Sequence, residues 1–135
     1  MPRRQRLLSL GVHSILAAAL LTACAPMVPL APAAFTPLAQ GQPAPELRVA
    51  SAVELQVGPG YRRTLAAGSR WRLAGRMPQG EVYRPVDGVF TIEGRQVHEA
   101  YLVVASRAVV GFYLPGEAQY SPLSHPINLS LGGAL

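Results

Sequence analysis

The stretch VHEAYLVVASRAVVGFYLP, residues 97–115, decides the fold class of this chain. It holds two runs, 97–105 and 108–115, that are rich in β-branched and aromatic residues, a composition that favours strands. Only Ser106 and Arg107 separate the runs, which is the spacing of a two-residue hairpin turn, although this pair lacks the glycine that such turns prefer. Because both faces of the runs are largely apolar, we expect an antiparallel hairpin at the centre of a barrel or sandwich.

Strand-like segments flank this hairpin. Residues 47–57 alternate apolar and polar side chains, with a bend expected near Ser51. Further strands are expected over 69–75, 86–92 and 126–131, with a hairpin turn at Glu93-Gly94-Arg95-Gln96. No window of helical length after residue 23 shows a helical period. The sequence therefore predicts an all-β domain over residues 46–135, a small antiparallel barrel or sandwich of about five to seven strands.

The amino-terminal residues have the layout of a secretory signal. Three arginines precede an apolar run over residues 7–23, which is shorter than the roughly 20 residues of a spanning helix. The run closes on Leu21-Thr22-Ala23-Cys24, which resembles the lipobox of bacterial lipoproteins. The resemblance implies cleavage of a signal peptide over residues 1–23 and lipid attachment to the Cys24 sulfur. The alternatives are an uncleaved signal anchor, or a cleaved signal that leaves a free thiol.

The resemblance also implies a cellular location. In Gram-negative lipoproteins an aspartate after the cysteine retains the protein at the inner membrane. Here that residue is Ala25, which implies transfer to the outer membrane, with the domain facing the periplasm. Two or more acyl chains make such attachment stable, since one chain alone anchors only marginally.

The segment that follows is dense in proline. Residues 25–45 contain six prolines and six alanines and no charged residue. Each proline removes a backbone N–H donor and restricts the residue before it, so neither a helix nor a central strand is expected. We interpret residues 24–45 as the lipidated cysteine and a semi-rigid tether, which could reach roughly 60 Å as a polyproline II helix. A proline motif for peptide recognition is the alternative.

Charge argues against nucleic acid as a partner. Removing residues 1–23 takes away Arg3, Arg4 and Arg6 and no acid, so the formal charge falls from +5 to +2. No basic stripe interleaved with aromatic residues is present in the sequence, and an envelope location is unfavourable for nucleic-acid binding.

Motifs for catalysis are missing from the sequence. It contains no GxGxxG, no GxxxxGK[ST], no GxSxG and no HExxH. After residue 23 the histidines are His98 and His125, so a zinc site would need residues far apart in the chain. We expect no enzyme activity, no catalytic residue, no metal and no cofactor.

Two sets of polar residues are candidates for binding. His98 and Glu99 interrupt an apolar strand, where neighbours point to opposite faces, and Asp87 or Glu93 could meet them across the hairpin. The alternative is a hydrogen bond or ion pair with a structural role only.

Arg70 and Arg72 flank Trp71 and could form a basic face. Guanidinium groups bind phosphates and carboxylates bidentately, so lipid A phosphates, peptidoglycan carboxylates or an acidic protein surface are candidate partners. A solvated outer face of a strand accounts for the same residues without a partner. The sequence thus favours an outer-membrane lipoprotein whose β domain is a non-enzymatic binding or assembly module of the cell envelope. The alternative is a ligand sensor or an inhibitor of a wall-degrading enzyme.

Overall fold

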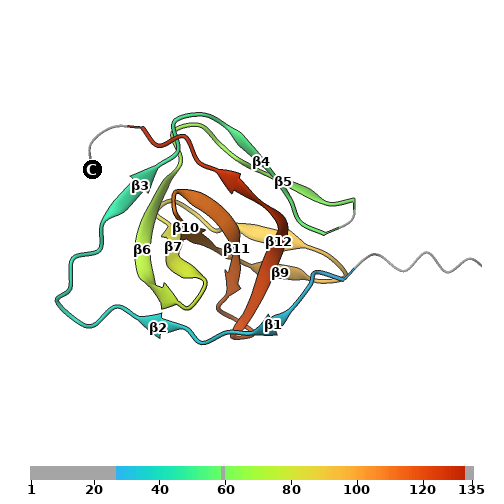
Figure 1. Cartoon of the computed structure of the whole chain (residues 1–135), viewed down its shortest axis with the longest axis horizontal. Helices are drawn as coiled ribbons and strands as arrows, with labels where there is room; N and C mark the ends of the chain where they lie inside the picture. The colour runs from blue at the N-terminus through green and yellow to red at the C-terminus, as the bar shows by residue number, and fades with distance from the viewer. Residues whose placement is uncertain (1–26, 59, 133–135) are drawn as a thin grey trace, which may run out of the picture.

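The computed structural model describes residues 27–58 and 60–132, and it confirms the all-β fold class. One antiparallel sheet curls into a half-barrel, and two small hairpins complete the domain (Figure 1). The expected signal peptide over residues 1–23 and the expected lipid site at Cys24 lie outside the described residues. The part of the chain that the structure describes contains no helix long and apolar enough to cross a membrane.

The large sheet runs in the order β1-β12-β11-β10-β7-β6-β2, and β3 also pairs with β6. Its strands are β1 (Ala31–Pro32), β2 (Thr36–Pro37), β3 (Glu46–Arg48), β6 (Arg70–Met77), β7 (Gly80–Pro85), β10 (Tyr101–Ala105), β11 (Ala108–Leu114) and β12 (Gln119–Asn128). The small hairpins pair β4 (Val53–Gln56) with β5 (Arg62–Leu65), and β8 (Thr91–Glu93) with β9 (Val97–Glu99).

The central hairpin forms as predicted, because β10 and β11 pair with each other and lie inside the sheet. Ser106 and Arg107 make its turn with φ angles of 49° and 62°. Positive φ at both central residues is the conformation of a type I′ turn, whose twist matches that of the strands. The tight turn therefore forms here without glycine.

Apolar residues of the central hairpin pack on both faces of the sheet. Leu102 and Phe112 belong to the main core on the concave side, where both are fully buried. Val103 and Tyr113 belong to a second cluster on the other side. This two-sided burial explains why the sequence of the hairpin is apolar on both faces.

The amino-terminal segment covers the second cluster. β1 pairs with β12 and β2 pairs with β6, so the segment from Ala31 to Pro37 joins two edges of the curled sheet (Figure 1). We call residues 28–38 the strap. Phe35 of the strap stacks on Tyr113 with ring centroids 4.4 Å apart. At the start of the strap, Val28 is 6% exposed and joins the main core.

The strap corrects the expected tether over residues 24–45. Within its described part, residues 27–45, two proline-containing strands belong to the large sheet. Proline is compatible with an edge strand because one side of such a strand needs no N–H donor. The folded domain thus includes residues well before Glu46.

The other strand predictions were right in part. The expected strand over 47–57 bends near Ser51, as predicted, and its two halves join different sheets as β3 and β4. The expected strand over 86–92 forms only from Thr91 onward, because the chain bends at residues 86–88 between β7 and β8. Its end, Thr91–Glu93, does form the predicted hairpin with β9. The final strand is β12, which begins well before Pro126.

Candidate functional site

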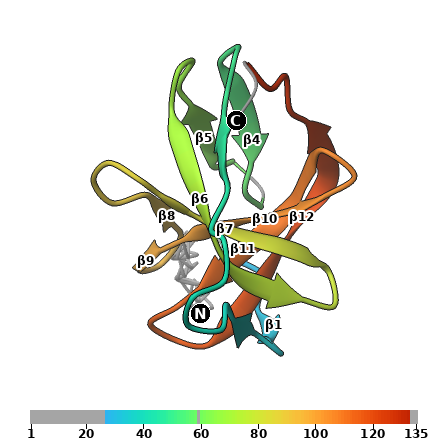
Figure 2. The same ribbon diagram turned by 90° about the vertical axis from the view of Figure 1, so that its left-hand side faces the viewer.

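A groove of about 660 Å³ lies at one mouth of the half-barrel, between the tips of the β6–β7 and β10–β11 hairpins. Figure 2 shows the two hairpins curving apart at this end of the molecule. Leu47, Val104 and Leu131 supply apolar side chains to its wall. Its size falls within the roughly 300–1,000 Å³ of ligand pockets, and barrel mouths are a common place for them.

Polar groups converge on the groove from β6 and β7. The Arg76 Nε lies 3.9 Å from Glu81 Oε1, and the Tyr83 hydroxyl donates a hydrogen bond of 2.7 Å to Glu81 Oε2. A β-bulge between Leu73 and Gly75 shifts the register of β6 against β7. The bulge reverses the alternation of β6, so that Arg76 lies directly opposite Glu81 on the face that Leu73 also occupies.

Tyr83 is held in its neutral form. Burial of the ring raises the pKa of the Tyr83 hydroxyl well above its ordinary value, and the hydrogen bond to Glu81 raises it further. The hydroxyl therefore acts as a donor that orients the Glu81 carboxylate. Arg107, on the β10–β11 turn, lines the opposite side of the groove. The arrangement offers two guanidinium groups and two carboxylates, those of Glu46 and Glu81, beside an apolar wall, which suits binding of an amphipathic ligand.

Arg70 and Arg72 lie on the outer side of β6, where acidic residues neutralise them. The Arg70 Nη2 is 3.2 Å from Asp87 Oδ2, and its Nη1 is 3.9 Å from Glu46 Oε2. Arg72 donates a hydrogen bond to the other Glu46 oxygen. Two guanidinium groups thus face two carboxylates, and the side chains of the arginines are 47% and 41% exposed. Exposed pairs of this kind contribute about 0–1 kcal/mol each. The geometry fits a solvated face, and an anionic partner would have to compete with Glu46 and Asp87.

His98 and Glu99 point to opposite sides of β9, as predicted. His98 is 7% exposed, whereas Glu99 is exposed. The expected partners, Asp87 and Glu93, do not meet His98; its Nδ1 instead donates a hydrogen bond of 2.7 Å to Glu117 Oε1 in the β11–β12 turn. This contact joins β9 to the β11–β12 turn, two segments that are distant in sequence. The hydrogen bond to Glu117 satisfies the buried His98 ring and gives this residue a structural role.

A smaller hollow of about 190 Å³ lies beside Arg70 and Trp71. The Trp71 ring packs edge-on against Phe90 with centroids 5.2 Å apart, and the Arg63 guanidinium lies 4.6 Å from the centre of the Phe90 ring. Val89 at the rim is 69% exposed. This volume is below that of ordinary ligand pockets and suits a single side chain.

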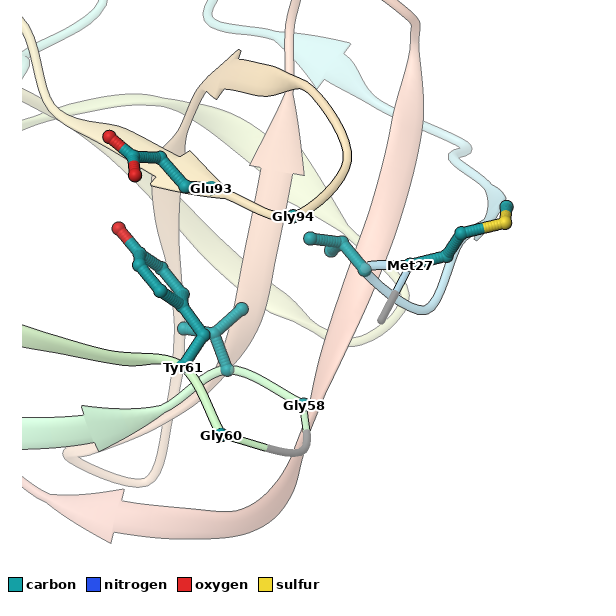
Figure 3. A pocket seen from close by; sticks show the side chains of 8 residues that line it. Met27, Gly58, Gly60, Tyr61, Glu93 and Gly94 are labelled. Atoms are coloured by element: carbon teal, nitrogen blue, oxygen red, sulfur yellow. The ribbon is translucent and has the colours of Figure 1, made fainter. Parts of the chain in front are cut away.

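Two further hollows, of about 140 and 170 Å³, share Met27 and Val28. Figure 3 shows the first of them, between Gly94 of the β8–β9 loop and Gly58 of the β4–β5 loop, with the Met27 side chain pointing away from it. Tyr61 and Glu93 form its far wall. Residue 27 therefore lies where two hairpin loops come together.

No group of three or more His, Cys, Asp or Glu side chains that could hold a metal ion occurs within residues 27–58 and 60–132. The groove residues Glu81 and Tyr83 were not predicted from the sequence. Their spacing of two places them on one face of a strand, but the bulge that brings Arg76 beside them has no clear sequence signal. Comparison of the chain with protein families, with curated proteins and with solved structures found no match.

Proposed function

We propose that the protein is an outer-membrane lipoprotein whose β domain is a non-enzymatic binding module of the cell envelope. The anchoring part of the proposal rests on Leu21-Thr22-Ala23-Cys24 after an apolar run, with Ala25 next. The lack of nucleophile and metal motifs in the sequence favours binding over catalysis.

The groove at the barrel mouth is the observation that carries the binding role. A ligand with an apolar portion would pack on Leu47 and Val104, and an anionic group on it would reach Arg107 and would compete with Glu81 for Arg76. Desolvating the ligand's apolar part against this wall contributes about 25 cal/mol per Å² of buried area, and the guanidinium groups fix its orientation. Envelope ligands with this chemistry include peptidoglycan peptides, anionic glycolipids and segments of envelope proteins.

Affinity purification after cross-linking tests the binding role. The wild-type protein is recovered from detergent-solubilised envelope, and its bound material is identified by mass spectrometry. Arg76→Gln should reduce this recovery several-fold. The matched control is Arg62→Gln, because Arg62 also forms an exposed ion pair with a glutamate, 3.0 Å from Glu54, but lies outside the groove. Equal recovery with both variants would contradict binding at the groove.

Labelling with a radioactive fatty acid tests the anchoring. The wild-type chain should incorporate label, and Cys24→Ala should not, because the substitution removes the sulfur that accepts the diacylglycerol. Cys24→Ala should also accumulate as an uncleaved precursor. Equal incorporation in the two proteins would refute the lipobox assignment.

A further inference from the structure

The distance between the lipid site and the folded domain is short, if the proposed lipidation of Cys24 is accepted. The strap packs on the domain from Val28 onward, so only three residue steps separate Cys24 from Met27. A fully extended chain covers at most about 3.6 Å per residue, so three steps span roughly 11 Å. The end of the domain that carries residue 27 must therefore lie next to the membrane surface. A tether that ran through residue 45 would instead have allowed a wide gap between the domain and the membrane.

Exposed apolar side chains gather at this same end. Among the described residues, two of the four large hydrophobic side chains that are exposed are Met27 at 64% and Leu30 at 45%. Met27 and Leu30 line one hollow together with Arg95 and Gln96, which lie between β8 and β9. Isolated exposed hydrophobics need no explanation, but a group of them beside an anchoring site indicates a contact surface.

The charge at this end suits phospholipid headgroups. The Arg95 Nη1 lies 3.9 Å from the Met27 sulfur, and no carboxylate of the described residues is within 4.0 Å of the Arg95 guanidinium. Glu93 is the acidic residue nearest in the hairpin, and its carboxylate points away from Met27 (Figure 3). A guanidinium free of carboxylates can bind lipid phosphates, and each basic residue near an anionic membrane contributes about 1 kcal/mol.

We propose that Met27, Leu30 and Arg95 form a membrane-contact surface that rests on the phospholipid leaflet holding the Cys24 lipid. The proposal rests on the proposed anchoring and goes beyond it by fixing the orientation of the domain. Figure 1 places β3, β6 and β7, which border the barrel-mouth groove, at the opposite end of the domain from residue 27. The strands that border the groove therefore lie at the end of the domain away from the membrane.

Depth-dependent fluorescence quenching tests this orientation. The full chain is expressed with Leu30→Cys, purified with its lipid and labelled at residue 30 with an environment-sensitive fluorophore. It is then reconstituted into vesicles of phosphatidylethanolamine and phosphatidylglycerol that carry a nitroxide quencher near the headgroups. The matched control is Val89→Cys. Val89 is 69% exposed, but it precedes β8 and therefore lies at the end of the β8–β9 hairpin that is remote from the loop.

We expect quenching of the label at residue 30 to be several-fold stronger than that of the label at residue 89. Equal quenching at the two positions, on protein shown by intact mass to carry the lipid, would overturn the membrane-contact surface and leave the anchoring intact. A mass that shows unmodified Cys24 would instead refute the anchoring itself, and this inference with it.

Discussion

Replacing Phe35 by alanine tests whether the strap belongs to the folded domain. Phe35 is half-buried, stacks on Tyr113 at 4.4 Å and lies so close to Gly75 that a Cβ there would come within 2.5 Å of its ring. Full burial of a phenylalanine is worth about 3–5 kcal/mol relative to alanine, so a half-buried ring should contribute about 2 kcal/mol. For a domain of this size that loss lowers Tm by about 10 °C.

Urea unfolding of residues 24–135, followed by the fluorescence of their single tryptophan, measures this loss. Trp71 is 3% exposed and reports on the core. The control is Leu30→Ala, a substitution in the same strap at a side chain that is 45% exposed. It should change the free energy of unfolding by less than about 0.5 kcal/mol. A Phe35→Ala protein as stable as wild type would refute the packed strap and restore a free tether.

Three further outcomes are expected. Leu102→Ala should lower the free energy of unfolding by about 2–5 kcal/mol in the same urea assay, because Leu102 is 0% exposed in the main core; a loss below about 1 kcal/mol would contradict that packing. Replacing Arg70 and Arg72 together by serine should change the free energy of unfolding by no more than about 1 kcal/mol. The same replacement should leave recovery of envelope material unchanged at every salt concentration, because Glu46 already neutralises part of this face. Because the pKa of Tyr83 is raised in the folded state, stability should be complete below the ordinary tyrosine pKa of 10.0 and fall as the pH rises above it. Thermal unfolding across that range should show a smaller fall for Tyr83→Phe.

The fold class could be predicted because the strongest signals in the sequence are local. Alternation over residues 47–57 and the two apolar runs around Ser106 and Arg107 each specify strands without knowledge of their neighbours. The strap could not be predicted in this way. Its prolines argue against a strand in general, and only pairing with the edges of β12 and β6 makes them acceptable.

The candidate sites were harder to predict because they depend on long-range contacts. The partner of His98 is Glu117, which is 19 residues away, and no local pattern distinguishes it from the nearer Glu93. The groove depends on a β-bulge in β6 that turns Arg76 toward Glu81. Adding one residue to a strand reverses every following side chain, so a small irregularity has a large effect on which residues meet.

Intact mass spectrometry of the protein purified from membranes tests the central proposal most directly. A lipoprotein is expected to begin at Cys24 and to carry a diacylglyceryl group together with a further acyl chain on the amino terminus. Acid or base hydrolysis of the esters should shift the mass by the fatty acids released. A chain that retains residues 1–23, or that begins after them with an unmodified Cys24, would contradict the proposal.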